Sequence, residues 1–164
     1  MIVEQSRKHA AQFSHSRPAE ETVPSVVMPP ATAARTKRTR KRALIVEANT
    51  SSLRLCRDIL KGSGFQIETT GSGIAALTSA REQQPDLIMM DLQLPDVPGR
   101  EFIGWIRDVP QLRSTPIIIF AGATGETAEL AHLGPNELLR KPVSALGIHR
   151  AIREALKSDE DCTR

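Results

Sequence analysis

Short apolar runs recur along the chain from residue 43 onward. Three of them, at residues 43–46, 87–90 and 117–120, are four residues long and unbroken. Runs of this length are too short for a helix, and their uniform apolar character fits strands buried on both faces of a parallel sheet. Two weaker strands are predicted at residues 65–69 and 137–140, which gives five strands.

The segments between these strands carry residues at helical spacing, three or four positions apart. The predicted inner faces consist of Leu53, Cys56, Ile59 and Leu60; Ile74, Leu77 and Thr78; Phe102, Trp105, Ile106 and Val109; and Ala145, Ile148, Ile152 and Ala155. A weaker helix is predicted at residues 126–133. Thr50 or Ser51 would cap the first helix, and Pro85 would end the second. The alternation predicts an α/β fold with a doubly wound, five-stranded parallel sheet in the flavodoxin-like order 2-1-3-4-5.

Residues 1–42 show no such periodicity and are predicted to be a disordered basic tail. With one aromatic residue and four prolines, this segment cannot bury enough surface to offset the entropy of ordering it. Its last eight residues, 35–42, hold six Lys or Arg. That density suits nucleic acid, anionic lipid or an acidic partner, but a solvated linker explains it equally well because no aromatic residue interleaves the charges. We expect one domain at residues 43–157 and a frayed C-terminus at residues 158–164.

Composition limits the classes of protein that fit. The net charge of +3 divides into +6 for residues 1–42 and −3 for the remainder, so the basic character belongs to the tail. Cys56 and Cys162 form no paired motif, which argues against a disulfide framework or a zinc site and favours a reducing, cytoplasmic setting. No apolar run approaches the roughly eighteen residues of a membrane span, and the first residues do not resemble a secretory signal.

Asp91 ends the most apolar strand and is followed by a loop rich in Pro and Gly. In an open α/β sheet, ligands and reactive groups gather outside the carboxyl ends of the strands. A carboxylate here is well placed for chemistry. Taken alone, however, Asp91 fits equally well as a residue that caps the next turn.

A dinucleotide site is one alternative. Residues 71–76 match the G-x-G-x-x-A fingerprint between a strand and a helix, and Asp91 closes the following strand. The motif lies on the second strand–helix unit rather than the first, and the domain leaves no room for a substrate-binding part. This alternative therefore ranks low.

Phosphoryl chemistry is the stronger hypothesis because three strand ends carry matching groups. Glu47 follows the first strand, Asp91 ends the third and Lys141 follows the fifth. The order 2-1-3-4-5 brings these residues to one edge of the sheet. Two acids can hold a divalent cation, and a lysine can neutralise a phosphoryl oxygen.

Three segments with these residues resemble the receiver domain of bacterial two-component response regulators, chiefly the single-domain chemotaxis and cell-division type. They are residues 44–49 (LIVEAN), 85–99 (PDLIMMDLQLPDVPG) and 140–142 (RKP). The resemblance implies that Asp91 accepts phosphate from a phosphohistidine on a sensor histidine kinase or a histidine phosphotransferase. It implies a magnesium ion held by Asp91, by Glu47 at the position of the acid pair after the first strand, and by the backbone carbonyl of Gln93. It also implies that Lys141 contacts the phosphoryl group and that a cis peptide bond precedes Pro142.

The sequence departs from the family at three positions. Ala48 replaces the second acid of the pair, Ala121 replaces a Ser or Thr, and Leu138 replaces an aromatic residue. The first change should weaken magnesium binding, because hard cations depend on the number and charge of their oxygen ligands. Two outcomes remain open: a phosphoacceptor of reduced efficiency, or a pseudo-receiver that binds partners without phosphorylation. In both, we expect a stand-alone signalling module rather than an enzyme, acting through an unidentified downstream protein.

Overall fold

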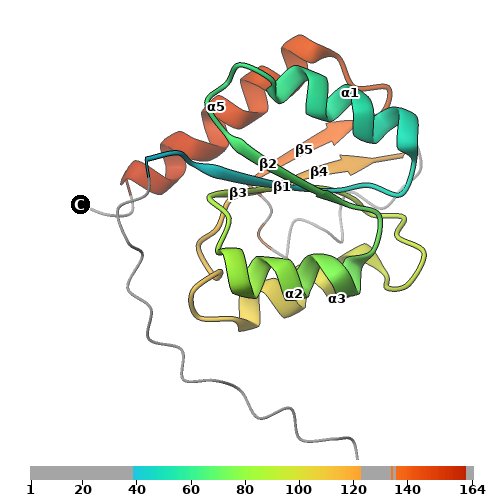
Figure 1. Cartoon of the computed structure of the whole chain (residues 1–164), viewed down its shortest axis with the longest axis vertical. Helices are drawn as coiled ribbons and strands as arrows, with labels where there is room; N and C mark the ends of the chain where they lie inside the picture. The colour runs from blue at the N-terminus through green and yellow to red at the C-terminus, as the bar shows by residue number, and fades with distance from the viewer. Residues whose placement is uncertain (1–38, 123–133, 135, 162–164) are drawn as a thin grey trace, which may run out of the picture. The chain divides into compact units, whose positions relative to one another are not determined.

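Five parallel strands form a single sheet in the order β2-β1-β3-β4-β5, which confirms the predicted topology (Figure 1). The computed structural model describes residues 39–122, 134 and 136–161. The strands are β1 (Arg42–Val46), β2 (Gln66–Thr70), β3 (Leu87–Asp91), β4 (Ile117–Ala121) and β5 (Glu137–Arg140). The predictions for the tail at residues 1–38, for a helix at residues 126–133 and for residues 162–164 lie outside the described residues.

Four helices within the described residues cover the two faces of the sheet: α1 (Thr50–Leu60), α2 (Gly73–Gln83), α3 (Gly99–Asp108) and α5 (Ala145–Asp161). Helices α1 and α5 lie on one face, and α2 and α3 lie on the other (Figure 1). Alternate residues of the central strands belong to two separate hydrophobic clusters, one on each face of the sheet. In β3, Ile88 and Met90 pack toward α2 and α3, while Leu87 and Met89 pack toward α1 and α5. Both faces of the central strands are buried, which explains their unbroken apolar sequence.

Four local predictions were wrong. Helix α1 is capped by Asn49 rather than Thr50 or Ser51, because the Asn49 Oδ1 accepts hydrogen bonds from the N–H groups of Ser51 and Ser52, each at 3.0 Å. In α2, Ile74 is 56% exposed, since the small residues Gly73, Ala76 and Ala80 form the buried face instead. The last helix continues to Asp161 rather than fraying from residue 158, because each residue added to a helix gains a backbone hydrogen bond. Trp105, predicted on the inner face of α3, is 37% exposed, and Ile103 is fully buried in that helix instead.

Candidate functional site

Three charged side chains meet at the carboxyl end of the sheet. The Lys141 Nζ lies 2.6 Å from the Asp91 Oδ2 and 3.1 Å from the Glu47 Oε2. Strand register accounts for this meeting, because β1 and β3 pair directly with Val46 opposite Met90. Lys141 follows β5 and must reach across β4, which its long side chain allows. The structure therefore brings together residues that are 50 and 94 positions apart in the sequence.

The two carboxylates are largely withdrawn from solvent. Glu47 is 2% exposed and Asp91 is 7% exposed, whereas the Lys141 side chain remains 31% exposed. Burial by itself would lower the pKa of Lys141, but hydrogen bonds and charge from Asp91 and Glu47 outweigh burial and raise it. The ammonium is therefore held charged, and it compensates two carboxylates that would otherwise repel each other.

Backbone contacts fix the lysine in place. The Lys141 N–H donates to the Ala121 carbonyl at 2.8 Å, which continues the β4–β5 ladder to the edge of the site. The peptide bond between Lys141 and Pro142 is cis, as the resemblance implies. On the opposite side, the Asn49 N–H donates to the Glu47 Oε1 at 2.8 Å. Each carboxyl oxygen of Glu47 thus has a partner within the chain.

The loop after Asp91 closes on itself and carries Gln93. Gln93 and Pro98 form an isolated antiparallel bridge, and the Gly99 N–H donates to the Leu92 carbonyl at 3.0 Å. A Cβ at residue 99 would lie 2.6 Å from the Leu92 Cα, so only glycine fits this closure. The Gln93 N–H donates to the Asp91 Oδ1 at 3.4 Å, a long bond that leaves this oxygen free to take another partner.

The three departures from the family leave apolar side chains around the charged cluster. Ala48 is exposed beside Glu47 and supplies no carboxylate. Ala121 is 1% exposed and belongs to the hydrophobic cluster under α2 and α3, against which Leu138 also packs. The end of β4 therefore offers no hydroxyl to a group bound at Asp91.

The donor set fits magnesium only in a reduced form. Within the described ranges, no group of three or more His, Cys, Asp or Glu side chains could enclose a metal ion. The Asp91 Oδ1 and the Gln93 carbonyl are the least engaged oxygens, whereas each oxygen of the third predicted ligand, Glu47, already accepts one hydrogen bond, from Asn49 or from Lys141. Magnesium commonly keeps several waters and binds through one or two carboxylates plus a phosphate, so this small set of oxygens fits the ion.

The G-x-G-x-x-A segment has a structural role in this fold. Its N–H groups at the start of α2 are taken by the Asp96 carboxylate, which accepts from Gly73 at 2.9 Å and from Ile74 at 3.0 Å. A pyrophosphate would need these same donors, so the geometry argues against a dinucleotide site. The importance of Asp96 was missed from the sequence, because a single acid in a Pro-rich loop gives no distinctive signal.

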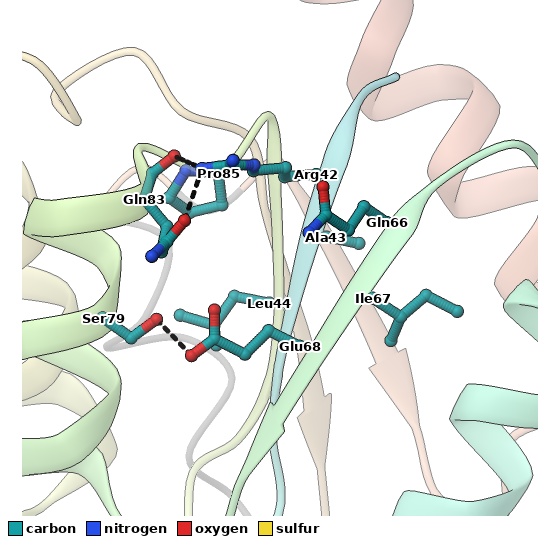
Figure 2. Close-up of a pocket in the computed structure, with 9 residues that line it drawn as sticks. All are labelled: Arg42, Ala43, Leu44, Gln66, Ile67, Glu68, Ser79, Gln83 and Pro85. Carbon is teal, nitrogen blue, oxygen red and sulfur yellow. Dashed lines mark hydrogen bonds between the residues drawn. The ribbon is translucent and has the colours of Figure 1, made fainter. Parts of the chain in front are cut away.

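Arg42 also has an assigned structural role. Figure 2 shows its guanidinium reaching over Pro85 to Gln83, where Nη1 donates to the backbone carbonyl at 3.0 Å. The Arg42 N–H donates to the Asp86 Oδ2 at 2.7 Å. The last cation of the basic run is therefore an anchor of the domain rather than part of a free charged segment.

Two cavities adjoin these features. A cavity of about 170 Å³ lies beside the charged cluster and is lined by Glu47, Lys141, Leu55 and Val143, among others. A cavity of about 310 Å³ lies between α2 and the first halves of β1 and β2, where Glu68 and Ser79 point toward each other and hydrogen bond at 2.6 Å (Figure 2). Among the described helices, none is long and apolar enough to cross a bilayer.

Comparison with known proteins agrees with this geometry. The family model of the response regulator receiver domain matches residues 43–153. The chain is 39% identical over 106 residues to the polar-differentiation response regulator DivK of Brucella ovis, covering 63% of this chain and 86% of that protein. The chemotaxis response regulator CheY4 of Vibrio cholerae matches with a TM-score of 0.67 and 26% identity, over 72% of this chain and 100% of that chain. The receiver domain of the sensor histidine kinase PA1611 of Pseudomonas aeruginosa has a magnesium ion coordinated in its active-site cleft. It matches with a TM-score of 0.67 and 27% identity, over 72% of this chain and 98% of that chain.

Proposed function

Because the chain belongs to the response regulator receiver domain family, we propose that Asp91 accepts a phosphoryl group in two-component signalling. The observation that supports this role is the contact between the Lys141 Nζ and the Asp91 Oδ2 at 2.6 Å. An acid that merely capped a turn would not need a buried position opposite a lysine from another strand. The proposed donor is a phosphohistidine on a sensor histidine kinase or a histidine phosphotransferase.

The proposed transfer is a single displacement at phosphorus. A carboxylate oxygen of Asp91 forms a bond to phosphorus while the bond from phosphorus to the histidine nitrogen breaks, and the imidazole leaves with the electron pair. Lys141 donates a hydrogen bond to a phosphoryl oxygen and balances its charge. Glu47, buried behind the lysine, keeps the ammonium oriented when Asp91 is no longer a full carboxylate. Asp91, Glu47 and the Gln93 carbonyl would hold magnesium, which would supply further positive charge to the phosphoryl oxygens.

We propose reduced efficiency because two partners of the phosphoryl group are missing. Ala48 removes a metal carboxylate, and Ala121 removes a hydroxyl. A charge-assisted hydrogen bond is worth about 1.5 to 3 kcal/mol. Moving a two-state equilibrium from mostly off to mostly on needs about 5.5 kcal/mol of differential stabilisation. The missing hydroxyl alone therefore removes a large share of the free energy that would drive the switch.

The test is direct phosphorylation of the full chain. Incubation with a phosphorylated histidine donor and magnesium should label the protein with an adduct that survives mild acid and is lost in base, which is the behaviour of an acyl phosphate. The Asp91→Asn variant should not label, whereas Asp86→Asn, which changes the acid just before the same strand, should still label. Label that persists in Asp91→Asn would refute the assignment.

The second candidate is a pseudo-receiver, a receiver fold that binds its partner without phosphorylation. The exposed Ala48 and the buried Ala121 favour it, because both remove groups that serve only the phosphoryl switch. In that case the affinity for the downstream protein should not change between wild type and Asp91→Asn. For the phosphoacceptor, affinity should depend on phosphorylation and Asp91→Asn should abolish the difference. The cytoplasm stays the predicted location, and nucleic acid binding by the basic run stays a prediction.

A further inference from the structure

Asp96 ties the loop that carries Gln93 to the start of α2. Its carboxylate accepts three hydrogen bonds: from the Ser72 hydroxyl at 2.6 Å, from the Gly73 N–H at 2.9 Å and from the Ile74 N–H at 3.0 Å. Ser72 is the N-cap residue of α2 and accepts from the Ala75 N–H at 3.1 Å with the same oxygen. The cap of one helix and the loop before the next therefore form one hydrogen-bonded unit.

Side-chain packing beneath Asp96 makes the contact rigid. A Cβ at residue 73 would lie 2.2 Å from the Val97 Cγ1 and 3.0 Å from the Leu94 Cδ1, so the helix backbone rests directly on the loop. Leu94 packs against the hydrophobic cluster and Val97 is part of it, which holds the loop from the inside. Asp96 holds the same loop from the outside. Displacing its carboxylate would leave the loop attached by one side only.

The far end of this loop is the part closest to the phosphoryl chemistry. Gln93 follows Asp91 by two residues, pairs with Pro98 and donates to the Asp91 carboxylate. Asp96 lies inside the turn that the Gln93–Pro98 bridge and the Gly99–Leu92 hydrogen bond close, so a movement at residue 96 reaches the Gln93 backbone through Pro98. Misplacing a group near the reacting atoms by about 1 Å can cost up to roughly a hundredfold in rate.

We propose that Asp96 is a positioning residue, which orients the Gln93 carbonyl and the Asp91 carboxylate by fastening their loop to α2. This inference rests on the proposed function for its effect on rate, but not for its effect on the loop. The proposal also gives the Gly-rich turn at the start of α2 a role, because the N–H groups of this turn bind the Asp96 carboxylate. Asp96 does not itself touch the transferred group.

The test compares Asp96→Ala and Asp96→Asn with Glu82→Ala, which removes an exposed acid from the last turns of α2. Amide hydrogen exchange and the carbonyl ¹³C resonance of Gln93 are measured by NMR on the full chain. Asp96→Ala should speed exchange at Gly99 about tenfold and shift the Gln93 resonance, with Asp96→Asn intermediate because it keeps one acceptor oxygen. Glu82→Ala should change neither.

Phosphorylation supplies the second readout. The labelling rate of Asp91 should fall about tenfold in Asp96→Ala and partly recover in Asp96→Asn, with the protein still folded. Faster exchange at Gly73 and Ile74 alone, with Gly99 and Gln93 unchanged, would show a simple helix cap and overturn the proposal. If wild type cannot be labelled at all, the proposed function fails, and the NMR measurements still decide whether Asp96 positions the loop.

Discussion

Replacing Lys141 with Met should destabilise the domain far more than breaking an equally short ion pair on the surface. The substitution keeps the length of the side chain and removes the charge between Asp91 and Glu47. Removing one partner of a buried ion pair costs about 3–5 kcal/mol, because the remaining charge is left without compensation. Since the Lys141 side chain is 31% exposed and water screens part of the charge, we expect a loss of about 2–4 kcal/mol at neutral pH.

The chain offers a control with the same geometry. Lys61 and Asp58 also lie 2.6 Å apart, but their side chains are 66% and 58% exposed. Exposed pairs contribute about 0–1 kcal/mol, so Lys61→Met should cost no more than this. The short distance is equal in the two pairs, but Lys141 is less exposed and compensates two carboxylates instead of one. The comparison therefore separates a buried charge cluster from an exposed pair of the same length.

The assay is urea denaturation followed by far-UV circular dichroism, with the slope of the transition checked for constancy between variants. Adding Asp91→Asn to Lys141→Met should recover part of the loss, since one buried carboxylate then remains. A deficit for Lys141→Met no larger than that of Lys61→Met would refute the view that the ammonium compensates the cluster.

Three further predictions follow from the same contacts. Ala48→Asp should restore a metal carboxylate and tighten magnesium binding about tenfold or more, as measured by isothermal titration calorimetry. Asn49→Asp makes the same charge change one residue away, at the α1 cap, and should not tighten magnesium binding. Arg42→Ala should lower the free energy of unfolding by about 1–3 kcal/mol, because the contact with Gln83 is lost. Arg40→Ala removes an exposed cation two residues earlier and should change the free energy of unfolding by less than about 0.5 kcal/mol. The pKa of Lys141 is raised above its ordinary value of 10.5, so its stabilising effect should be complete below pH 10.5 and should decline as the pH rises through the pKa of the folded state. If the melting temperatures of wild type and Lys141→Met fall in parallel over that pH range, this expectation is contradicted.

The strand pattern could be predicted because it depends on local chemistry. Leu87–Asp91 is buried at every position, and a strand covered on both faces must be apolar along its length. Alternation of strands with helices then limits the topology to a doubly wound sheet, since parallel neighbours require right-handed crossovers. The convergence of Glu47, Asp91 and Lys141 could be expected for the same reason: each stands at the carboxyl end of a strand.

Contacts between elements decided what the sequence could not. Whether Ile74 or Ala76 is buried depends on how α2 packs, and Gly73 lets the start of α2 lie directly against Val97 and Leu94, where a Cβ would clash. Asp96 and Arg42 look like ordinary loop and linker charges until the fold supplies their partners, more than twenty and more than forty residues away. Periodicity reports which side of an element is buried, but the identity of a side chain's neighbour is set by packing across the sheet, which no local pattern encodes.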